Sequence, residues 1–330
     1  MGFSQIAIIT IIAILAAIVV IIAIMIIAGF ATFKRFIGKQ KKELNLKDTR
    51  YIPQFGDTYE DYVNFIKDKQ EYMETLEKSE HIIETFDGIK LKGYYFPAKE
   101  DSKITIICSP SHRSTCFNDF SAILSFFNNK NYNVLFTVSR AHIGSEGNYI
   151  TLGKKESKDL IRWAEFINNK TPGQSIFIYG ANLGAVNAMI LTGLDYIPSN
   201  IKGVISDSGY SRAYDFLLYQ IRHEYNLSPY PTVPIANWFA KKIAKVNFKE
   251  SSPIDCLQKS TLPVLFIHGN KDQFVPTYMG DACYRACSSP KKLLIIDDAP
   301  HIQSYFINPE KYEEAFDDFV NEYAVNQNKD

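Results

Sequence analysis

The sequence predicts an α/β fold: a mostly parallel eight-stranded sheet with helices on both faces and a helical cap, preceded by one transmembrane helix. Short apolar runs of strand length alternate with helical patterns over most of the chain, which is typical of a parallel sheet buried on both faces. The stretch 3–33 carries no charged residue. The stretch 175–194 has the pattern of a strand, a tight glycine turn and an apolar helix, and it indicates where the functional site lies.

Length and composition limit the class of protein. A chain of 330 residues accommodates a membrane segment and one large domain, or two smaller domains. The 36 basic and 36 acidic residues balance, so net charge indicates no nucleic-acid partner. The five cysteines are scattered, without CxxC or metal-binding spacing, which is typical of free thiols in a reducing compartment.

Residues 1–33 are predicted to form a retained membrane anchor. A helix crosses a bilayer with about 20 apolar residues, and this stretch is longer. The alternative, a secretory signal peptide, has a basic start and a shorter apolar core of roughly 7–15 residues, and neither is present. Basic residues follow at once, so the positive-inside rule predicts a single-pass protein of the cell membrane, with the N-terminus outside and the domain in the cytoplasm. These residues are Lys34, Arg35, Lys39, Lys41 and Lys42.

Three further segments follow the anchor. Residues 34–80 are interpreted as a basic juxtamembrane linker and a helix, because apolar side chains recur at helical spacing within 59–78. Residues 81–330 are expected to form the globular domain. An aromatic-rich interruption of the strand–helix alternation, about 210–247, is interpreted as a cap inserted over the end of the sheet.

The domain is expected to open with a β-hairpin around the turn signal Asp87-Gly88 and to continue with alternating strands and helices. The predicted strands are 81–86, 91–96, 104–108, 134–138, 176–179, 203–206, 264–267 and 293–296. The predicted helices are 119–127, 155–168, 183–194, 278–287 and 309–323.

The turn at 180–184 has the G-x-S-x-G pattern of a nucleophile elbow, with Asn182 at the serine position. Small residues keep such a turn tight and hold the bracketed side chain exposed at the head of the following helix. An amide has no ionisable proton to give up and is a very poor nucleophile. The meaning of this asparagine therefore decides the functional interpretation.

Four more motifs follow the expected strands in order: RAHIGSEG at 140–147, DSGY at 207–210, HGNKDQFVP at 268–276 and APH at 299–301. With the elbow, they make the chain resemble the α/β-hydrolases, and in particular the membrane-anchored bacterial hydrolases related to serine aminopeptidases and acyl esterases. The resemblance covers about residues 80–325. It implies the α/β-hydrolase fold, with Asp272 as the triad acid and His301 as the base. The structural alternative is a buried His–Asp hydrogen bond that only fixes two loops.

The same resemblance exposes three departures from the family pattern. Asn182 replaces the nucleophile, Ile143 stands where the loop motif usually has glycine, and the loop after the third strand reads CSPSHR at 108–113 instead of beginning with H-G. Leu183 N–H and Ser111 are the remaining candidates for the oxyanion hole, because Pro110 has no N–H to donate. Three departures at the expected rim of the site indicate a site released from hydrolysis or turned to another use.

Two hypotheses follow. The first is a hydrolytically impaired pseudo-hydrolase, a membrane-tethered binding or regulatory domain. The second is an active esterase, peptidase or acyl hydrolase that uses Asp272 and His301 with Asn182 deamidated to aspartate or with a displaced nucleophile. The candidates for the displaced nucleophile are Ser109, Ser111, Ser114 and Cys116.

The expected partners are the lipid bilayer, through the N-terminal helix, and a small-molecule, acyl or peptide ligand in a pocket under the aromatic cap. Alternatively, the aromatic rings of the cap only pack it onto the domain. No zinc-protease motif, phosphate loop or dinucleotide fingerprint occurs, so the sequence predicts no cofactor and no metal.

Overall fold

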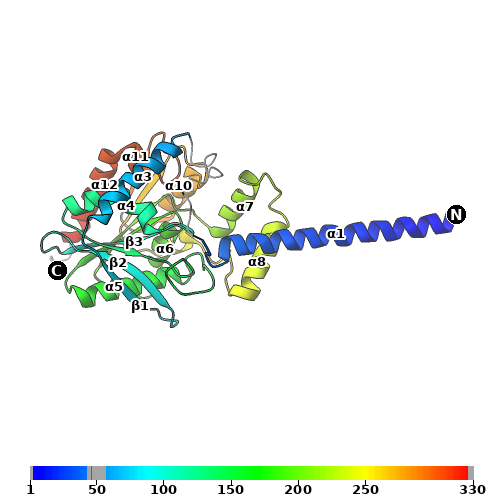
Figure 1. The fold of residues 1–330 in the computed structure, drawn as a ribbon, viewed down its shortest axis with the longest axis horizontal. Coiled ribbons are helices and arrows are strands. Elements are labelled where there is room, and N and C mark those ends of the chain that lie inside the picture. The colour runs from blue at the N-terminus through cyan, green and yellow to red at the C-terminus, as the bar shows by residue number, and fades with distance from the viewer. Residues whose placement is uncertain (1–2, 43–45, 47–56, 326–330) are drawn as a thin grey trace.

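The computed structural model describes residues 3–42, 46 and 57–325. Its centre is one eight-stranded sheet in the order β1-β2-β4-β3-β5-β6-β7-β8 (Figure 1). Only β2 pairs antiparallel, with β1 and with β4, and the other neighbours are parallel. This confirms the predicted sheet. The strands are β1 Ser79–Glu84, β2 Lys90–Phe96, β3 Ile104–Ser109, β4 Asn133–Thr137, β5 Ser175–Ala181, β6 Ile201–Asp207, β7 Val264–Gly269 and β8 Lys291–Ile296.

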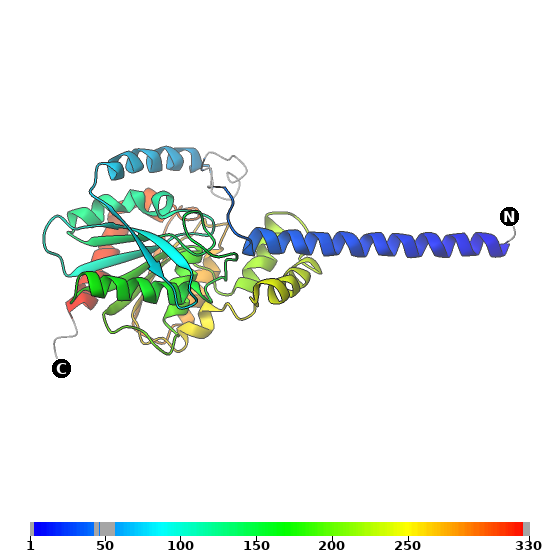
Figure 2. The ribbon, with the colours of Figure 1, turned by 60° about the horizontal axis from the view of Figure 1, so that its bottom comes forward.

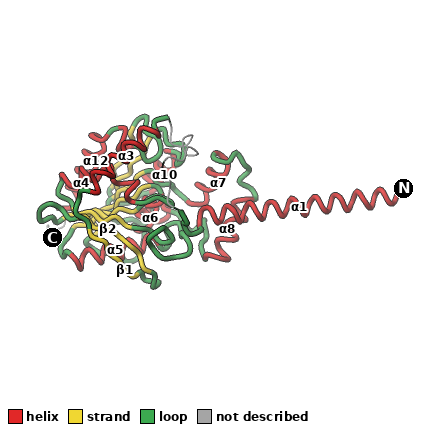
Figure 3. The backbone as a smooth tube through the Cα atoms, in the orientation of Figure 1, coloured by secondary structure: helices red, strands yellow, loops and turns green. Residues whose placement is uncertain are grey.

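Helices cover both faces of the sheet (Figure 3), and the side chains of the central strand β5 show why. Successive side chains of a strand point to opposite faces. Ile176 and Ile178 belong to one core cluster, with α5 Glu156–Lys170 and α6 Leu183–Leu191. Phe177 and Tyr179 belong to a second cluster on the other face. The helices of that second face are α4 Cys116–Asn129 and α12 Pro309–Val325.

Three short helices and one longer helix complete the body of the domain. They are α9 Pro253–Leu257, α10 Thr277–Ala286, α11 Ser304–Ile307 and α3 Tyr59–Glu74. Helix α3 corresponds to the helix predicted within 59–78. Its buried side chains Tyr59, Tyr62 and Ile66 pack with Ala122 of α4.

The segment between β6 and α9 is helical, as the sequence predicts for 210–247, and is called the cap here. It holds α7 Ala213–His223, α8 Thr232–Phe239 and a π-helical turn, η2 Ala240–Ala244. Figures 1 and 2 show α7 and α8 at the end of the domain from which the N-terminal helix projects.

The N-terminal helix α1 runs from Phe3 to Ile37 and extends far beyond the domain (Figure 2). Side chains 5–27 are exposed. Within the described residues, α1 is the one helix long and apolar enough to cross a membrane, a test of length and composition alone. It continues past residue 33, where the sequence places the end of the anchor, and one face of its last turns is buried: Phe33, Phe36 and Ile37 lie in the core of the domain.

The junction between α1 and the cap is close-packed. A Cβ on Gly29 would lie 2.3 Å from the side chain of Ile235 in α8, so only glycine allows this approach. The ring of Phe239 packs 5.0 Å from Phe30 and 6.3 Å from Phe33. The C-terminal turns of α1 are therefore packed against the cap and the core, while its N-terminal part projects from the domain.

Candidate active site

The elbow between β5 and α6 places Asn182 at the head of α6. Asn182 has φ 49° and ψ −108°, a sparsely populated backbone conformation that asparagine tolerates better than most residues. The two glycines allow the turn to close. A Cβ on Gly180 would lie 2.1 Å from the carbonyl oxygen of Gly184, and a Cβ on Gly184 would lie 1.9 Å from that of Ser109. The turn has the geometry of a nucleophile elbow with an amide at its tip.

His301 and Asp272 lie beside Asn182, on the loops after β8 and β7. His301 Nδ1 is 2.7 Å from Asp272 Oδ2, and His301 Nε2 is 3.0 Å from Asn182 Nδ2. The carboxylate accepts, so Nδ1 carries the proton. The Asn182 amide can only donate from nitrogen, so Nε2 accepts. The structure thus brings together all three residues that the resemblance assigns to the triad, with histidine in the tautomer that a general base requires.

Asp272 is held as a carboxylate. Burial alone would raise its pKa, but the favourable electrostatic interaction with His301 and hydrogen bonds from His268 and His301 lower the pKa of Asp272 below its usual value. Its other oxygen accepts hydrogen bonds from the N–H groups of Phe274, at 2.9 Å, and Val275, at 2.7 Å. The ring of Phe274 also packs 4.7 Å from that of His301. The carboxylate of Asp272 and the imidazole of His301 are therefore oriented and shielded from water.

Asn182 also accepts a hydrogen bond from the N–H of Leu183, the first predicted donor of the oxyanion hole. Leu183 N–H donates to Asn182 Oδ1 at 2.7 Å. This bond fixes the orientation of the Asn182 amide, because the N–H of Leu183 can donate to Oδ1 but not to the NH₂ group. One side chain therefore engages the base through its nitrogen and the oxyanion donor through its oxygen. It blocks both groups that a serine nucleophile would use.

The second predicted donor, Ser111, is also engaged. Its backbone N–H donates to Asp119 Oδ2 at 2.7 Å, and the Ser114 hydroxyl donates to Asp119 Oδ1 at 2.7 Å. Asp119, in α4, was not among the residues predicted from the sequence. In this conformation the Ser111 N–H is directed at the carboxylate and is not open to an oxyanion.

The surroundings of Asp119 predict a pH effect. Burial raises the pKa of Asp119 to about 6, against the opposing effect of the hydrogen bonds from Ser111 and Ser114. Between about pH 4 and pH 6 the folded chain therefore retains a proton that the unfolded chain releases, and stability falls as the pH rises. Over this window we expect the free energy of unfolding of the native chain to fall by about 1–2 kcal/mol relative to Asp119→Asn. Urea unfolding of both chains at the two ends of the window measures this, and parallel profiles would contradict it.

The rest of the loop after β3 holds the end of α1. His112 Nε2 is 3.0 Å from the carbonyl oxygen of Phe36. Arg113 donates to the carbonyls of Lys34, at 3.0 Å, and Gly38, at 2.8 Å. These groups lie at the C-terminal end of α1, where carbonyls lack helical partners and basic side chains are favoured. Burial, and the nearby charge of Arg113, lower the pKa of His112 to about 3, so it binds as a neutral donor.

The third departure, Ile143, lies at the same junction. Its N–H is 3.4 Å from Gln40 Oε1, just beyond α1. Gln40 also donates through Nε2 to the carbonyl of Arg113 at 2.8 Å. Ile143 does not line the cavity above Asn182. The expectation that all three departures lie on the rim of the active site is therefore wrong for Ile143, because it faces the segment that follows α1.

A cavity of about 180 Å³ lies over the site. Asn182, His301 and Asp119 line it, together with residues that the sequence did not place there. Arg35 and Phe36 come from α1, Tyr59 and Tyr62 from α3, and Glu224 from the end of α7. The sequence pattern placed Tyr59 and Tyr62 only in a helix. It did not place any of these five residues at the site, because contacts between segments so distant in the chain leave no periodic signal. The aromatic residues of the cap sequence mostly pack against the core or α1, and this cavity is closed by α1 and α3 as well as the cap.

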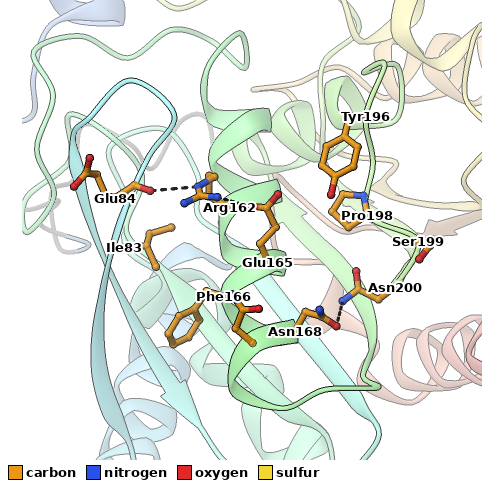
Figure 4. Close-up of a pocket in the computed structure, with 11 residues that line it drawn as sticks. Ile83, Glu84, Arg162, Glu165, Phe166, Asn168, Tyr196, Pro198, Ser199 and Asn200 are labelled. Carbon is orange, nitrogen blue, oxygen red and sulfur yellow. Dashed lines mark hydrogen bonds and ion pairs between the residues drawn. The ribbon is translucent and has the colours of Figure 1, made fainter.

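A larger groove, of about 560 Å³, lies elsewhere, between β1, α5 and the loop before β6 (Figure 4). Its lining shares no residue with the cavity over Asn182. Arg162 donates to the carbonyl of Glu84, and Asn200 to the side chain of Asn168. These polar contacts lie far from the histidine and aspartate pair, so the smaller cavity is the candidate site. The described residues contain no cluster of three or more potential metal ligands.

Comparisons with known proteins agree with this architecture. No family model matches the chain. The uncharacterized protein YqkD of Bacillus subtilis (strain 168) is 28% identical over 253 residues, which cover 76% of this chain and 81% of YqkD. The uncharacterized protein YfhR of Escherichia coli (strain K12) is 22% identical over 239 residues, covering 71% of this chain and 77% of YfhR.

Solved structures extend the comparison to the fold. The Pyrococcus furiosus esterase Pf2001 superposes with a TM-score of 0.63 at 21% identity, over 78% of this chain and 94% of the esterase. The α/β hydrolase GrgF from Penicillium gives 0.60 at 16% identity, over 76% of this chain and 99% of GrgF. The acylaminoacyl peptidase of Pyrococcus horikoshii gives 0.56 at 16% identity, over 78% of this chain and 44% of the peptidase. With its sheet order, its elbow and these neighbours, the chain has the α/β-hydrolase fold.

Proposed function

We propose that this chain is a membrane-anchored binding or regulatory protein that uses an α/β-hydrolase site without hydrolysis. The bridge made by Asn182 is the observation that carries the proposal. Its amide has no ionisable proton to give up and is a very poor nucleophile. Its nitrogen engages His301, and its oxygen engages the N–H of Leu183. Adding a nucleophile to this site would require displacing both hydrogen bonds.

The membrane anchor is the second part of the proposal. Side chains 5–27 of α1 are exposed and apolar apart from Gln5 and Thr10, and at about 1.5 Å per residue this stretch is about 34 Å long. The hydrocarbon core of a bilayer is about 30 Å thick. The basic residues from Lys34 onwards support an N-terminus outside and a domain in the cytoplasm, by the positive-inside rule.

The departures in the loop after β3 fit the same proposal. His112 and Arg113 belong to the loop in which the resemblance to α/β-hydrolases predicts the start of an oxyanion hole, and here both bind carbonyls at the end of α1. The loop therefore connects the anchor to the cavity above Asn182. A site that has exchanged oxyanion stabilisation for contacts with its anchor is suited to binding and not to turnover.

The cavity supports an acyl or peptide ligand. Phe36, Tyr59 and Tyr62 give it apolar walls, and His301 and Asp119 give it polar groups at its base. Ligand sites of this kind combine apolar walls with a few placed polar groups. The structural neighbours are named as an esterase and an acylaminoacyl peptidase, and both names point to acyl groups as the chemistry of the shared site.

The alternative function is an active hydrolase with a displaced nucleophile, and Ser111 is the observation that favours it. Its hydroxyl is buried, lines the cavity and makes no hydrogen bond of normal geometry within the described residues. The other candidates fit less well. Ser114 donates to Asp119, Ser109 lies outside the cavity, and Cys116 bonds through Sγ to the carbonyls of Cys108 and Thr137, while burial raises its pKa well above the usual value.

Turnover and binding by the full chain in detergent test the proposal. The probes are p-nitrophenyl butyrate and acetyl-leucine p-nitroanilide. We expect hydrolysis by the native chain to be no faster than hydrolysis by His301→Ala. We also expect at least one probe to raise the melting temperature of the native chain in a saturable way. Turnover that clearly exceeds that of His301→Ala would overturn the proposal in favour of an active hydrolase, and the absence of any saturable shift would count against acyl binding.

A further inference from the structure

The cap exposes apolar side chains on several of its segments. Leu227 and Tyr230, between α7 and α8, are 58% and 56% exposed, Trp238 of α8 is 55% exposed, and Ile243 of η2 is 42% exposed. Exposed lysines lie beside them at Lys241, Lys242 and Lys245. These seven residues are called the cap rim. Exposed aromatic and aliphatic groups flanked by lysines are typical of surfaces that contact a membrane interface.

The cap rim lies beside α1, and α8 fixes its position. Ile235 packs over Gly29, and Phe239 packs on Phe30. The ring of Trp238 is 5.0 Å from that of Phe239. In Figures 1 and 2, α8 runs beside the last turns of α1, on the side of the domain from which α1 projects. The α8 part of the cap rim therefore lies beside the last turns of α1, at the end of the domain from which α1 projects.

The exposed stretch of α1 indicates where a bilayer would lie relative to the cap rim. Exposure is continuous over residues 5–27, Ala28 is partly buried, and Gly29 is buried under Ile235. The exposed stretch is about as long as a bilayer core is thick. A bilayer that covers residues 5–27 therefore ends where the cap begins.

We propose that the cap rim lies in the headgroup layer of the bilayer that α1 spans, and that its lysines favour anionic lipids. This inference rests on the proposed membrane anchor. Tryptophan and tyrosine accumulate at this depth, and lysines near an anionic surface are attracted to it. The nearby acidic side chain of Glu224 is paired with Arg35 at 3.2 Å. The charge of the rim therefore comes from its lysines.

The cap and α1, but no residue of the cap rim itself, also border the candidate ligand site. Arg35 of α1 and Glu224 of the cap both line the cavity over Asn182. The cap therefore contributes to both the cap rim and the cavity, without a residue common to the two.

Tryptophan fluorescence tests the proposal, because the chain has only two tryptophans. Trp163 is 1% exposed in the core, and Trp238 belongs to the cap rim. Trp163→Phe and Trp238→Phe therefore give full-length chains that report from one position each. Each chain is reconstituted into nanodiscs of phosphatidylcholine and phosphatidylglycerol, with and without lipids brominated near the headgroup end of the acyl chain.

In the Trp163→Phe chain we expect emission from Trp238 to shift to the blue and to lose most of its intensity to the brominated lipids. In the matched Trp238→Phe chain we expect neither change. In the Trp163→Phe background, Lys241→Gln/Lys242→Gln/Lys245→Gln should remove the dependence of quenching on phosphatidylglycerol. The control Lys99→Gln/Lys103→Gln/Lys259→Gln, at the opposite end of the sheet, should retain it.

Flotation with vesicles after a carbonate wash separates the possible failures. If the chain does not float, the anchor is wrong and the inference falls with it. If it floats but Trp238 is not quenched by lipid, the anchor stands and the inference alone is overturned. A blue shift that depends on protein concentration in detergent, without quenching by lipid, would assign the surface to a second copy of the chain and also overturns the inference.

Discussion

Replacing Asn182 by serine is expected to raise the turnover of p-nitrophenyl acetate by about 10³–10⁴-fold over the native chain. Loss of a triad nucleophile costs on the order of 10⁶ in kcat, and a missing oxyanion donor costs about 10²–10³. The serine would regain the base, because His301 is already oriented by Asp272. It would also free the N–H of Leu183. The gain should remain incomplete because the N–H of Ser111 donates to Asp119.

Two controls separate chemistry from the removal of the amide. Asn182→Ala frees the same groups without supplying a nucleophile, and it should show no gain. Asn182→Ser combined with His301→Ala should return to the level of the native chain. Equal rates for the serine and alanine variants would show that the loops around Asn182 no longer form a hydrolytic site.

The second large effect is expected at Arg140, in the loop after β4. Its buried guanidinium binds both oxygens of Asp159, at 2.7 and 2.6 Å, and both oxygens of Asp87, at 3.0 Å each. Burial, which outweighs the opposing effect of Arg140, raises the pKa of Asp159 to about 6. Arg140→Met would leave this carboxylate buried without a partner. We expect a loss of about 3–5 kcal/mol in the free energy of unfolding.

Urea unfolding at neutral pH measures the effect. Arg162→Met is the matched control, because Arg162 makes an exposed ion pair with Glu165 one helical turn along α5. That change should stay within about 0.5 kcal/mol. If Arg140→Met costs no more than the control, the guanidinium is not what compensates the buried carboxylate of Asp159.

The eight strands and their mostly parallel sheet could be predicted because their signals are local. Each strand from β3 to β8 is a short apolar run between turn residues, and the glycines at 180 and 184 mark one tight turn. Motif order placed Asp272 and His301 at the ends of their strands, and the structure brings them within hydrogen-bond distance. Predicting these features requires only local sequence patterns and the motif order of the α/β-hydrolases.

The rest depends on contacts between distant segments, which leave no pattern in the sequence. Nothing near Ser111 in the chain indicates that its N–H faces Asp119, or that His112 and Arg113 bind the end of α1. The engagement of Leu183 by Asn182 depends on one side-chain rotamer. The walls contributed by α1 and α3 depend on how these helices dock, which periodicity alone does not determine.

Labelling of the full chain with a fluorophosphonate probe tests the central claim, that Asn182 disarms an otherwise ordered site. The native chain, Asn182→Ser and Asn182→Ser/His301→Ala would be treated together, and adducts mapped by mass spectrometry. We expect only Asn182→Ser to form an adduct, at position 182. An adduct on the native chain that maps to Ser111 and disappears in Ser111→Ala would contradict the account and identify an active hydrolase with a displaced nucleophile.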